Sequence, residues 1–181
     1  MEKISTYIID NSYTYASYRA HIDELMEAGK TTGPNQGEAM LEYTRLNISR
    51  MKRLDKTARL TEESIAVLEK MDRPMTWLVI TEGWCGDAAQ IVPVLQKLAD
   101  RNEHIDLRLI LRDEHLEVMD AFLTDGGRSI PKVIFVDGTD QSVLGSWGPR
   151  PVAAQTMVMN TKEELQQISA AEIKAQRYKE S

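Results

Sequence analysis

Cysteine is almost absent from this sequence: Cys85 is the only one in 181 residues. A single cysteine excludes a disulfide within the chain and indicates a reducing compartment, which we expect to be the cytoplasm. Together with only three scattered histidines, it also excludes a structural zinc cluster built from cysteine and histidine. We therefore predict no metal and no other cofactor.

Basic residues are also scarce, with 22 lysines and arginines against 28 acidic residues and a formal net charge of −6. A nucleic-acid partner would need a clustered basic surface, so the charge argues against one. No apolar run approaches the roughly 18 residues of a membrane-spanning helix, so no membrane association is expected. The first 18 residues are broken by acidic and hydroxyl side chains, so we expect no secretory leader.

Residues 1–73 predict a helical N-terminal extension. Thr61 followed by two glutamates predicts the start of its third helix, which should end before Pro74. The residues that recur at helical spacing are Tyr18, Ile22, Leu25 and Met26 in the first helix and Leu41, Thr44, Ile48, Met51, Leu54 and Ala58 in the second. Basic residues on the other faces of the second helix are interpreted as solvated surface: Arg45, Arg50, Lys52, Arg53 and Lys56.

From residue 74 to residue 181 the pattern is that of an α/β domain. Near-continuous apolar runs indicate strands covered on both faces, and Asp137-Gly138 indicates a hairpin turn. The predicted strands are 75–81, 105–111, 133–136 and a segment through Val143 and Leu144; helices are expected after Cys85, over 116–123 and after Pro151. This order predicts a mixed sheet flanked by helices, with one parallel pair joined through a helix and one antiparallel hairpin.

Cys85 is expected at the point where the first strand passes into a helix. N–H groups at a helix start and the helix dipole stabilise a thiolate, so the pKa of a thiol there falls below its usual value of roughly 8.5. The negative charge of Asp87 opposes this, because a like charge disfavours the thiolate. A lone cysteine is more often a small buried hydrophobic residue. The position between Trp84 and Gly86 favours the reactive interpretation.

The residues around Cys85 resemble a known active site. Trp84-Cys85-Gly86-Asp87-Ala88 resembles the Trp-Cys-Gly-Pro-Cys motif of thioredoxins, and Pro93 lies where thioredoxins kink their active-site helix. Ser129-Ile130-Pro131-Lys132 resembles the thioredoxin Ile-Pro element, whose proline is cis and faces the cysteine. The resemblance therefore implies a thioredoxin-like fold with Cys85 as the catalytic thiol.

A second stretch carries the resemblance further along the chain. Gly148 resembles the glycine at the substrate rim of thioredoxins, and Trp147 beside it is either a rim residue or part of the core. The match covers roughly residues 75–175. Together with the helical extension, it is most similar to a group of bacterial thioredoxin-family proteins. A groove that binds an extended peptide would then be formed by Ser129, Ile130 and Pro131 beside Cys85.

The sequence departs from thioredoxins at three positions. Ala88 replaces the second cysteine, which normally releases the mixed disulfide, and Asp87 replaces the proline between the two cysteines. Val79 stands six residues before Cys85, where thioredoxins carry a buried aspartate that accepts the proton of the second thiol. The usual two-cysteine cycle therefore cannot take place within one chain.

Two classes of function remain open from the sequence. The first is a monothiol redox protein, in which Cys85 forms mixed disulfides with a client protein or a low-molecular-weight thiol and an external thiol resolves them. The second is a non-catalytic module that keeps the fold and binds a peptide or protein. A peroxidase is less favoured, because no Thr-x-x-Cys motif with a supporting arginine is present.

Overall fold

The computed structural model describes residues 1–161 and residue 165. Residues 1–149 form one compact unit, and a second begins at Arg150. The helix expected after Pro151 is present over residues 152–161, and its continuation lies outside the described residues. No helix in the described part of the chain is both long and apolar enough to cross a membrane.

The first unit is built on a four-stranded mixed sheet with the strand order β2-β1-β3-β4. Its strands are β1 (Met75–Thr81), β2 (Ile105–Leu111), β3 (Lys132–Asp137) and β4 (Val143–Trp147). β1 pairs in parallel with β2 and antiparallel with β3, and β3 and β4 form an antiparallel hairpin. The predicted mixed α/β sheet is confirmed.

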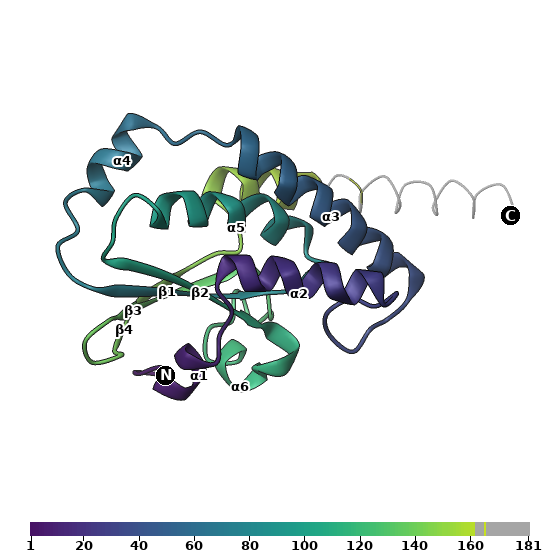
Figure 1. The fold of residues 1–181 in the computed structure, drawn as a ribbon, viewed down its shortest axis with the longest axis horizontal. Helices are drawn as coiled ribbons and strands as arrows, with labels where there is room; N and C mark the ends of the chain where they lie inside the picture. Colours follow the sequence, from purple (N-terminus) through teal and green to yellow (C-terminus); the bar gives the residue numbers. More distant parts are fainter. Residues whose placement is uncertain (162–164, 166–181) are drawn as a thin grey trace, which may run out of the picture. The chain divides into compact units, whose positions relative to one another are not determined.

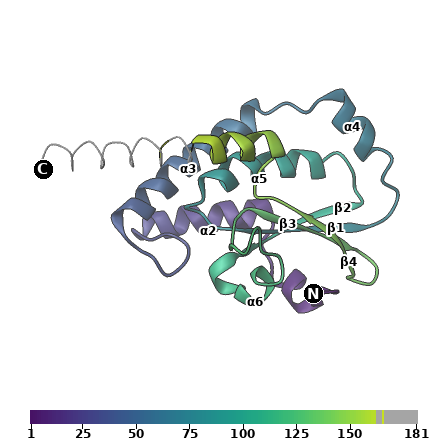
Figure 2. The same cartoon turned by 180° about the vertical axis from the view of Figure 1, so that it is seen from behind.

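Helices cover both faces of this sheet (Figure 1). The helices are α1 (Thr6–Asp10), α2 (Tyr15–Glu27), α3 (Glu38–Thr57), α4 (Glu62–Leu68), α5 (Gly86–Ala99), a 3-10 turn η1 (Arg112–Glu114) and α6 (Leu116–Met119). α2, α3 and α5 lie on one face, and α1 and α6 lie on the other, as the view from behind also shows (Figure 2).

The N-terminal helices share one apolar core with the sheet. α3 packs along α5, and α2 packs against α3 and β2. Tyr18 and Ile22 of α2 and Met51 of α3 are buried in the same cluster as the β1 residues Leu78 and Ile80. The apolar faces of the extension are thus covered by the domain that follows it. The domain boundary near residue 73 stays a prediction, and this core extends across it.

Two parts of the fold differ from the sequence-based expectation. The short helix α1 was not predicted; the residues around it reach the sheet through backbone bridges from Lys3 to Ser142 and from Tyr13 to Leu109. The helix expected over 116–123 ends already at Met119. Directly after Met119 the backbone changes to bonds that span three residues, from the Ala121 N–H to Val118 and from the Phe122 N–H to Met119, and a Thr124–Gly127 bridge follows before β3.

The shared core gives a direct test of coupling between the extension and the sheet. Met51→Ala removes a side chain that is 2% exposed, so the free energy of unfolding should fall by about 2–5 kcal/mol. Leu46→Ala, on the same helix but 47% exposed, should change it by about 0.5 kcal/mol or less.

Urea unfolding followed by tryptophan fluorescence measures both variants, because all three tryptophans (Trp77, Trp84 and Trp147) lie in or beside the sheet. A fluorescence transition that Met51→Ala leaves unshifted would show that the extension unfolds independently of the sheet.

Candidate functional site

Cys85 lies at the junction of β1 and α5. Six of the seven β1 residues are buried, so the end of the strand has a fixed position in the core. Cys85 is the N-cap of α5, and its sulfur accepts a hydrogen bond from the Ala88 backbone N–H at 3.4 Å. The prediction that a strand delivers this thiol to a helix start is confirmed. The sulfur occupies the place where a hydroxyl or carboxylate oxygen usually caps a helix.

The segment before β3 meets Cys85 from the other side. The Cys85 thiol donates a hydrogen bond to the Ile130 carbonyl oxygen at 3.4 Å, although 45 residues separate the two. The Ile130–Pro131 peptide bond is cis. Ile130 and Pro131 are buried and Ser129 is half-buried. The structure therefore brings this expected site segment into contact with the cysteine.

Gly148 lies directly after β4 and against Pro131. Its φ angle is +126°, and a Cβ at this position would collide with the Pro131 carbonyl oxygen. Only glycine fits both the backbone conformation and this close approach. Trp147 pairs with Val133 in the sheet and is half-buried against the core. Gly148 is thus the member of this pair that reaches the segment around Pro131.

Trp84, directly before Cys85, is held by an arginine that the sequence analysis did not single out. The Arg112 guanidinium carbon lies 4.9 Å from the centre of the Trp84 ring. Two hydrogen bonds to Asp113, at 2.8 and 3.2 Å, orient this guanidinium. A guanidinium over an indole face is a favourable cation–π arrangement. Residues just after β2 thereby support the residue next to the cysteine.

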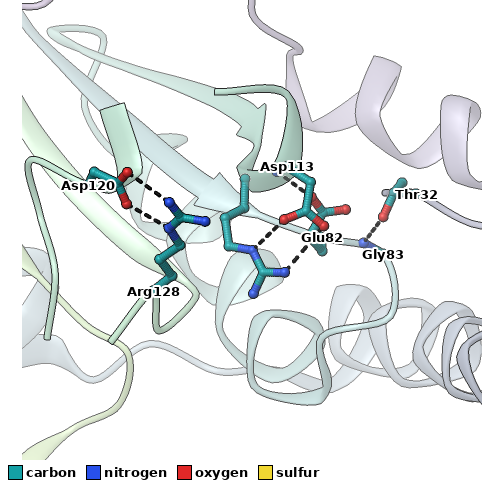
Figure 3. A network of polar contacts seen from close by, with 7 residues as sticks. Thr32, Glu82, Gly83, Asp113, Asp120 and Arg128 are labelled. Carbon is teal, nitrogen blue, oxygen red and sulfur yellow. Dashed lines mark hydrogen bonds and ion pairs between the residues drawn. The ribbon is translucent and has the colours of Figure 1, made fainter. Parts of the chain in front are cut away.

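Glu82 is a second residue that the sequence analysis missed. Its carboxyl group is 1% exposed, and its Oε1 accepts a hydrogen bond from the Asp113 backbone N–H at 3.0 Å (Figure 3). Within the described part of the chain, Oε2 has no hydrogen-bond partner. Burial raises the pKa of Glu82 above its ordinary value of 4.5, and this outweighs the lowering by the nearby Thr32 hydroxyl and the Asp113 amide. A buried acid is therefore present, three residues before Cys85 rather than six.

Gly86 and Asp87 form the first turn of α5, and both are half-buried. The interpretation of all basic α3 residues as solvated surface is wrong for Arg50. Arg50 is half-buried, and its Nη1 lies 3.2 Å from the position of a Cβ at Gly86. Arg50 lies three residues after the buried Asn47, on the same side of α3, and its guanidinium donates a hydrogen bond to the Asn47 amide oxygen at 3.0 Å. A cationic side chain from the extension thus lies beside the start of α5.

The positions that distinguish this site from a two-cysteine site lie in the core. Ala88 is 1% exposed and Val79 is fully buried. Alanine and valine carry no ionisable group, so neither side chain can take up or release a proton. Among the described residues, no group of three or more histidine, cysteine or acidic side chains is arranged to hold a metal ion.

Farther from the cysteine, Arg128 forms an exposed ion pair with Asp120 at 2.6 Å (Figure 3). Lys132, directly after the cis proline, is 5% exposed, and its ammonium group donates a hydrogen bond to the Thr124 hydroxyl at 2.6 Å. Burial lowers the pKa of this lysine. Both contacts tie the segment between α6 and β3 in place.

A mixed sheet with a thiol at the β1–α5 junction, facing an Ile-Pro segment, defines the thioredoxin-like class. A family model described as Thioredoxin matches residues 33–168, which is well over half of the sequence. The chain belongs to this thioredoxin family. The match begins within the N-terminal extension, so α3 is included in the family region.

Solved structures agree on the fold. A crystal structure of a protein of unknown function from Pseudomonas aeruginosa matches with a TM-score of 0.58 and 19% identity, covering 82% of this chain and 78% of that one. The crystal structure of an HIV epitope-scaffold matches with the same values. No curated protein matches the sequence.

The buried Glu82 predicts a specific pH dependence of stability. Its folded-state pKa is raised, so the folded state keeps the proton to higher pH than the unfolded state does. Its contribution to the free energy of unfolding therefore falls as the pH rises from 4.5 towards neutrality. Glu82→Gln cannot ionise, so the stability of the wild type relative to this variant should be greater at acidic than at neutral pH.

Urea unfolding of both proteins across this pH range measures the difference. Glu63→Gln, at an exposed position in α4, is the matched control. A wild-type stability that rises with pH relative to Glu82→Gln would contradict the burial argument.

Proposed function

We propose that this protein carries out monothiol disulfide exchange through Cys85. The observation that supports the proposal best is the position of the sulfur, which caps α5 and accepts the Ala88 N–H at 3.4 Å. The thiolate is the nucleophile in disulfide exchange, and an N–H donor at a helix start favours that form. The Arg50 guanidinium lies beside Gly86, the residue after Cys85, and adds a positive charge near the start of α5.

The reaction has two steps that balance without a cofactor. The Cys85 thiolate attacks one sulfur of a disulfide, forms a mixed disulfide and releases the other sulfur as a thiolate. A thiolate from outside the chain then attacks the mixed disulfide and releases Cys85. The outside thiol is needed because Ala88 occupies the place of the second cysteine. A low-molecular-weight thiol such as glutathione, or a client protein thiol in the cytoplasm, would serve as partner.

The polypeptide around the sulfur supports a protein client as well as a small thiol. Cys85 lies beside the Ile130 carbonyl oxygen, and half-buried Ser129 lies at the edge of this segment. An extended peptide bound along Ser129, Ile130 and Pro131 would place its own sulfur near Cys85. Trp84, Asp87, Trp147 and Gly148 would form the remainder of the rim.

One observation favours the alternative, a non-catalytic module that binds a peptide or protein. The Cys85 side chain belongs to the buried core and is only 7% exposed, which restricts the approach of a second sulfur. In that case the same rim would bind its partner without forming a covalent bond. The two functions differ in whether a mixed disulfide forms.

Mass spectrometry of the intact protein after incubation with oxidised glutathione decides between them. We expect one glutathione adduct on the wild type, none on Cys85→Ser, and loss of the adduct when an external thiol is added. The absence of an adduct under conditions that modify a cysteine in an unfolded peptide would leave the binding module as the function.

Restoring the second cysteine gives an independent prediction. Ala88→Cys places a thiol one helical turn after Cys85, within reach of a disulfide. This variant should form an internal disulfide and gain dithiol reductase activity on insulin. Gln90→Cys, five residues from Cys85 and exposed, should form none, because residues five apart do not face each other on a helix. An Ala88→Cys protein that keeps two reduced thiols under mild oxidation would argue against an exchange site.

A further inference from the structure

Gly83, two residues before Cys85, is bound from both sides by side chains of the N-terminal extension. Its backbone N–H donates a hydrogen bond to the Thr32 hydroxyl oxygen at 2.9 Å, and Figure 3 shows the two residues facing each other. Its carbonyl oxygen accepts a hydrogen bond from the Asn47 amide nitrogen at 3.0 Å. Thr32 and Asn47 are 2% and 1% exposed, so water does not replace these contacts.

The backbone at Gly83 has little freedom to move away from these two partners. A Cβ at this position would lie 3.3 Å from the Ile22 side chain and 3.5 Å from the Thr32 methyl group. A buried backbone N–H or carbonyl group that loses its partner costs free energy comparable to a lost hydrogen bond. Thr32 and Asn47 therefore fix where the chain runs between the end of β1 and Cys85.

The same contacts continue past the cysteine. Asn47 uses its amide nitrogen for Gly83 and its amide oxygen to accept the Arg50 guanidinium at 3.0 Å. Arg50 in turn lies against Gly86, the first residue of α5. Asn47 is thus connected to the loop on both sides of Cys85, directly before it and through Arg50 after it.

We propose that Thr32 and Asn47 are positioning residues of the Cys85 site: by binding both backbone groups of Gly83, they hold the sulfur against the Ala88 N–H. The N-terminal extension would then contribute to the site by positioning the loop that carries Cys85. The inference rests on the proposed function for its chemical meaning, since the position of the sulfur matters only if the thiol reacts. Both side chains act on the sulfur through the backbone of Gly83.

Several charged and titratable groups surround the loop, and their charges also influence the pH at which the Cys85 thiol ionises. Glu82 and Asp87 flank the cysteine in the chain, and Arg50 and Arg112 approach from α3 and from the end of β2. From α2, the buried Tyr18 hydroxyl lies within hydrogen-bond distance of Thr81, and burial raises the pKa of Tyr18 well above its ordinary range. None of these titratable and charged side chains is itself substituted in the variants proposed below.

Two substitutions release Gly83 by different routes. Thr32→Val removes the hydroxyl that accepts the Gly83 N–H, and Asn47→Leu removes the amide that binds the Gly83 carbonyl. Thr32→Val also alters the surroundings of Glu82, whereas Asn47→Leu instead leaves Arg50 without its acceptor. The two variants share only the loss of a Gly83 contact, so an effect common to both is assigned to Gly83.

Thr44→Val is the matched control. Thr44 is another buried threonine of the extension, and its hydroxyl bonds Thr31 and the Met40 carbonyl rather than the Cys85 loop. Thr32→Ser keeps the hydroxyl and serves as the conservative rescue. Urea unfolding curves of all variants measure how much stability each one loses. A shift of the alkylation profile that does not follow this loss of stability is then an effect on the site and not a general loss of structure.

The readout is the rate of Cys85 alkylation by iodoacetamide as a function of pH in the full-length protein. Loss of the Ala88 N–H contact should raise the midpoint of this profile by about one pH unit in Thr32→Val and Asn47→Leu, as expected for one hydrogen bond to a charged sulfur. Thr44→Val and Thr32→Ser should keep the wild-type midpoint. An unchanged or lowered midpoint in Thr32→Val, or an equal rise in Thr44→Val, would overturn the proposal.

Hydrogen exchange of the wild type provides a test that needs no substitution. The backbone amides of Gly83 and Ala88 should exchange only when the whole protein unfolds. Faster exchange of either amide, through local opening of the loop, would also overturn the proposal. These experiments distinguish failure of the positioning role from failure of the proposed disulfide exchange. If oxidised glutathione gives no adduct but the midpoint shifts as expected, the positioning role stands and disulfide exchange does not.

Discussion

The start of α5 is the constraint on which the site depends. The first N–H groups of a helix need hydrogen-bond acceptors, and here the Ala88 N–H donates to the Cys85 sulfur instead of the usual oxygen. This arrangement requires the end of β1, the loop through Gly83 and the helix to keep a fixed relation. β1 is held by its buried position in the sheet, and α5 is held by its packing along α3. The loop is held by side chains from the extension, so three distant parts of the chain meet at one thiol.

The architecture could be largely predicted because it is encoded locally. The apolar run of β1, the alternation in β2 and the Asp137-Gly138 turn each follow from a periodicity or a turn preference. The short helices could not be predicted in the same way. α1 is five residues long, and its neighbours contact a strand edge and a loop that are distant in sequence. The position where α6 ends depends on how soon the chain must turn into β3.

The candidate site was only partly visible in the sequence. Motif resemblance identified Cys85 and the Ile130–Pro131 segment, and the structure brings them together through a hydrogen bond from the thiol to Ile130. Glu82, Arg112 and the partners of Gly83 were missed because each acts through a contact between residues more than 25 positions apart. The comparison with thioredoxins directs attention to residue 79, six residues before the cysteine, and not to Glu82. Burial of a glutamate directly after a strand depends on tertiary packing.

The central claim is that this fold places a reactive thiol at a helix start. Ultraviolet absorbance of the thiolate, titrated against pH in the wild type with Cys85→Ser as the blank, tests it most directly. Partners at the start of α5 and the nearby Arg50 guanidinium should place the midpoint below the roughly 8.5 of an unstructured cysteine. A midpoint at or above that value would show that burial dominates and that Cys85 is a core residue rather than a nucleophile.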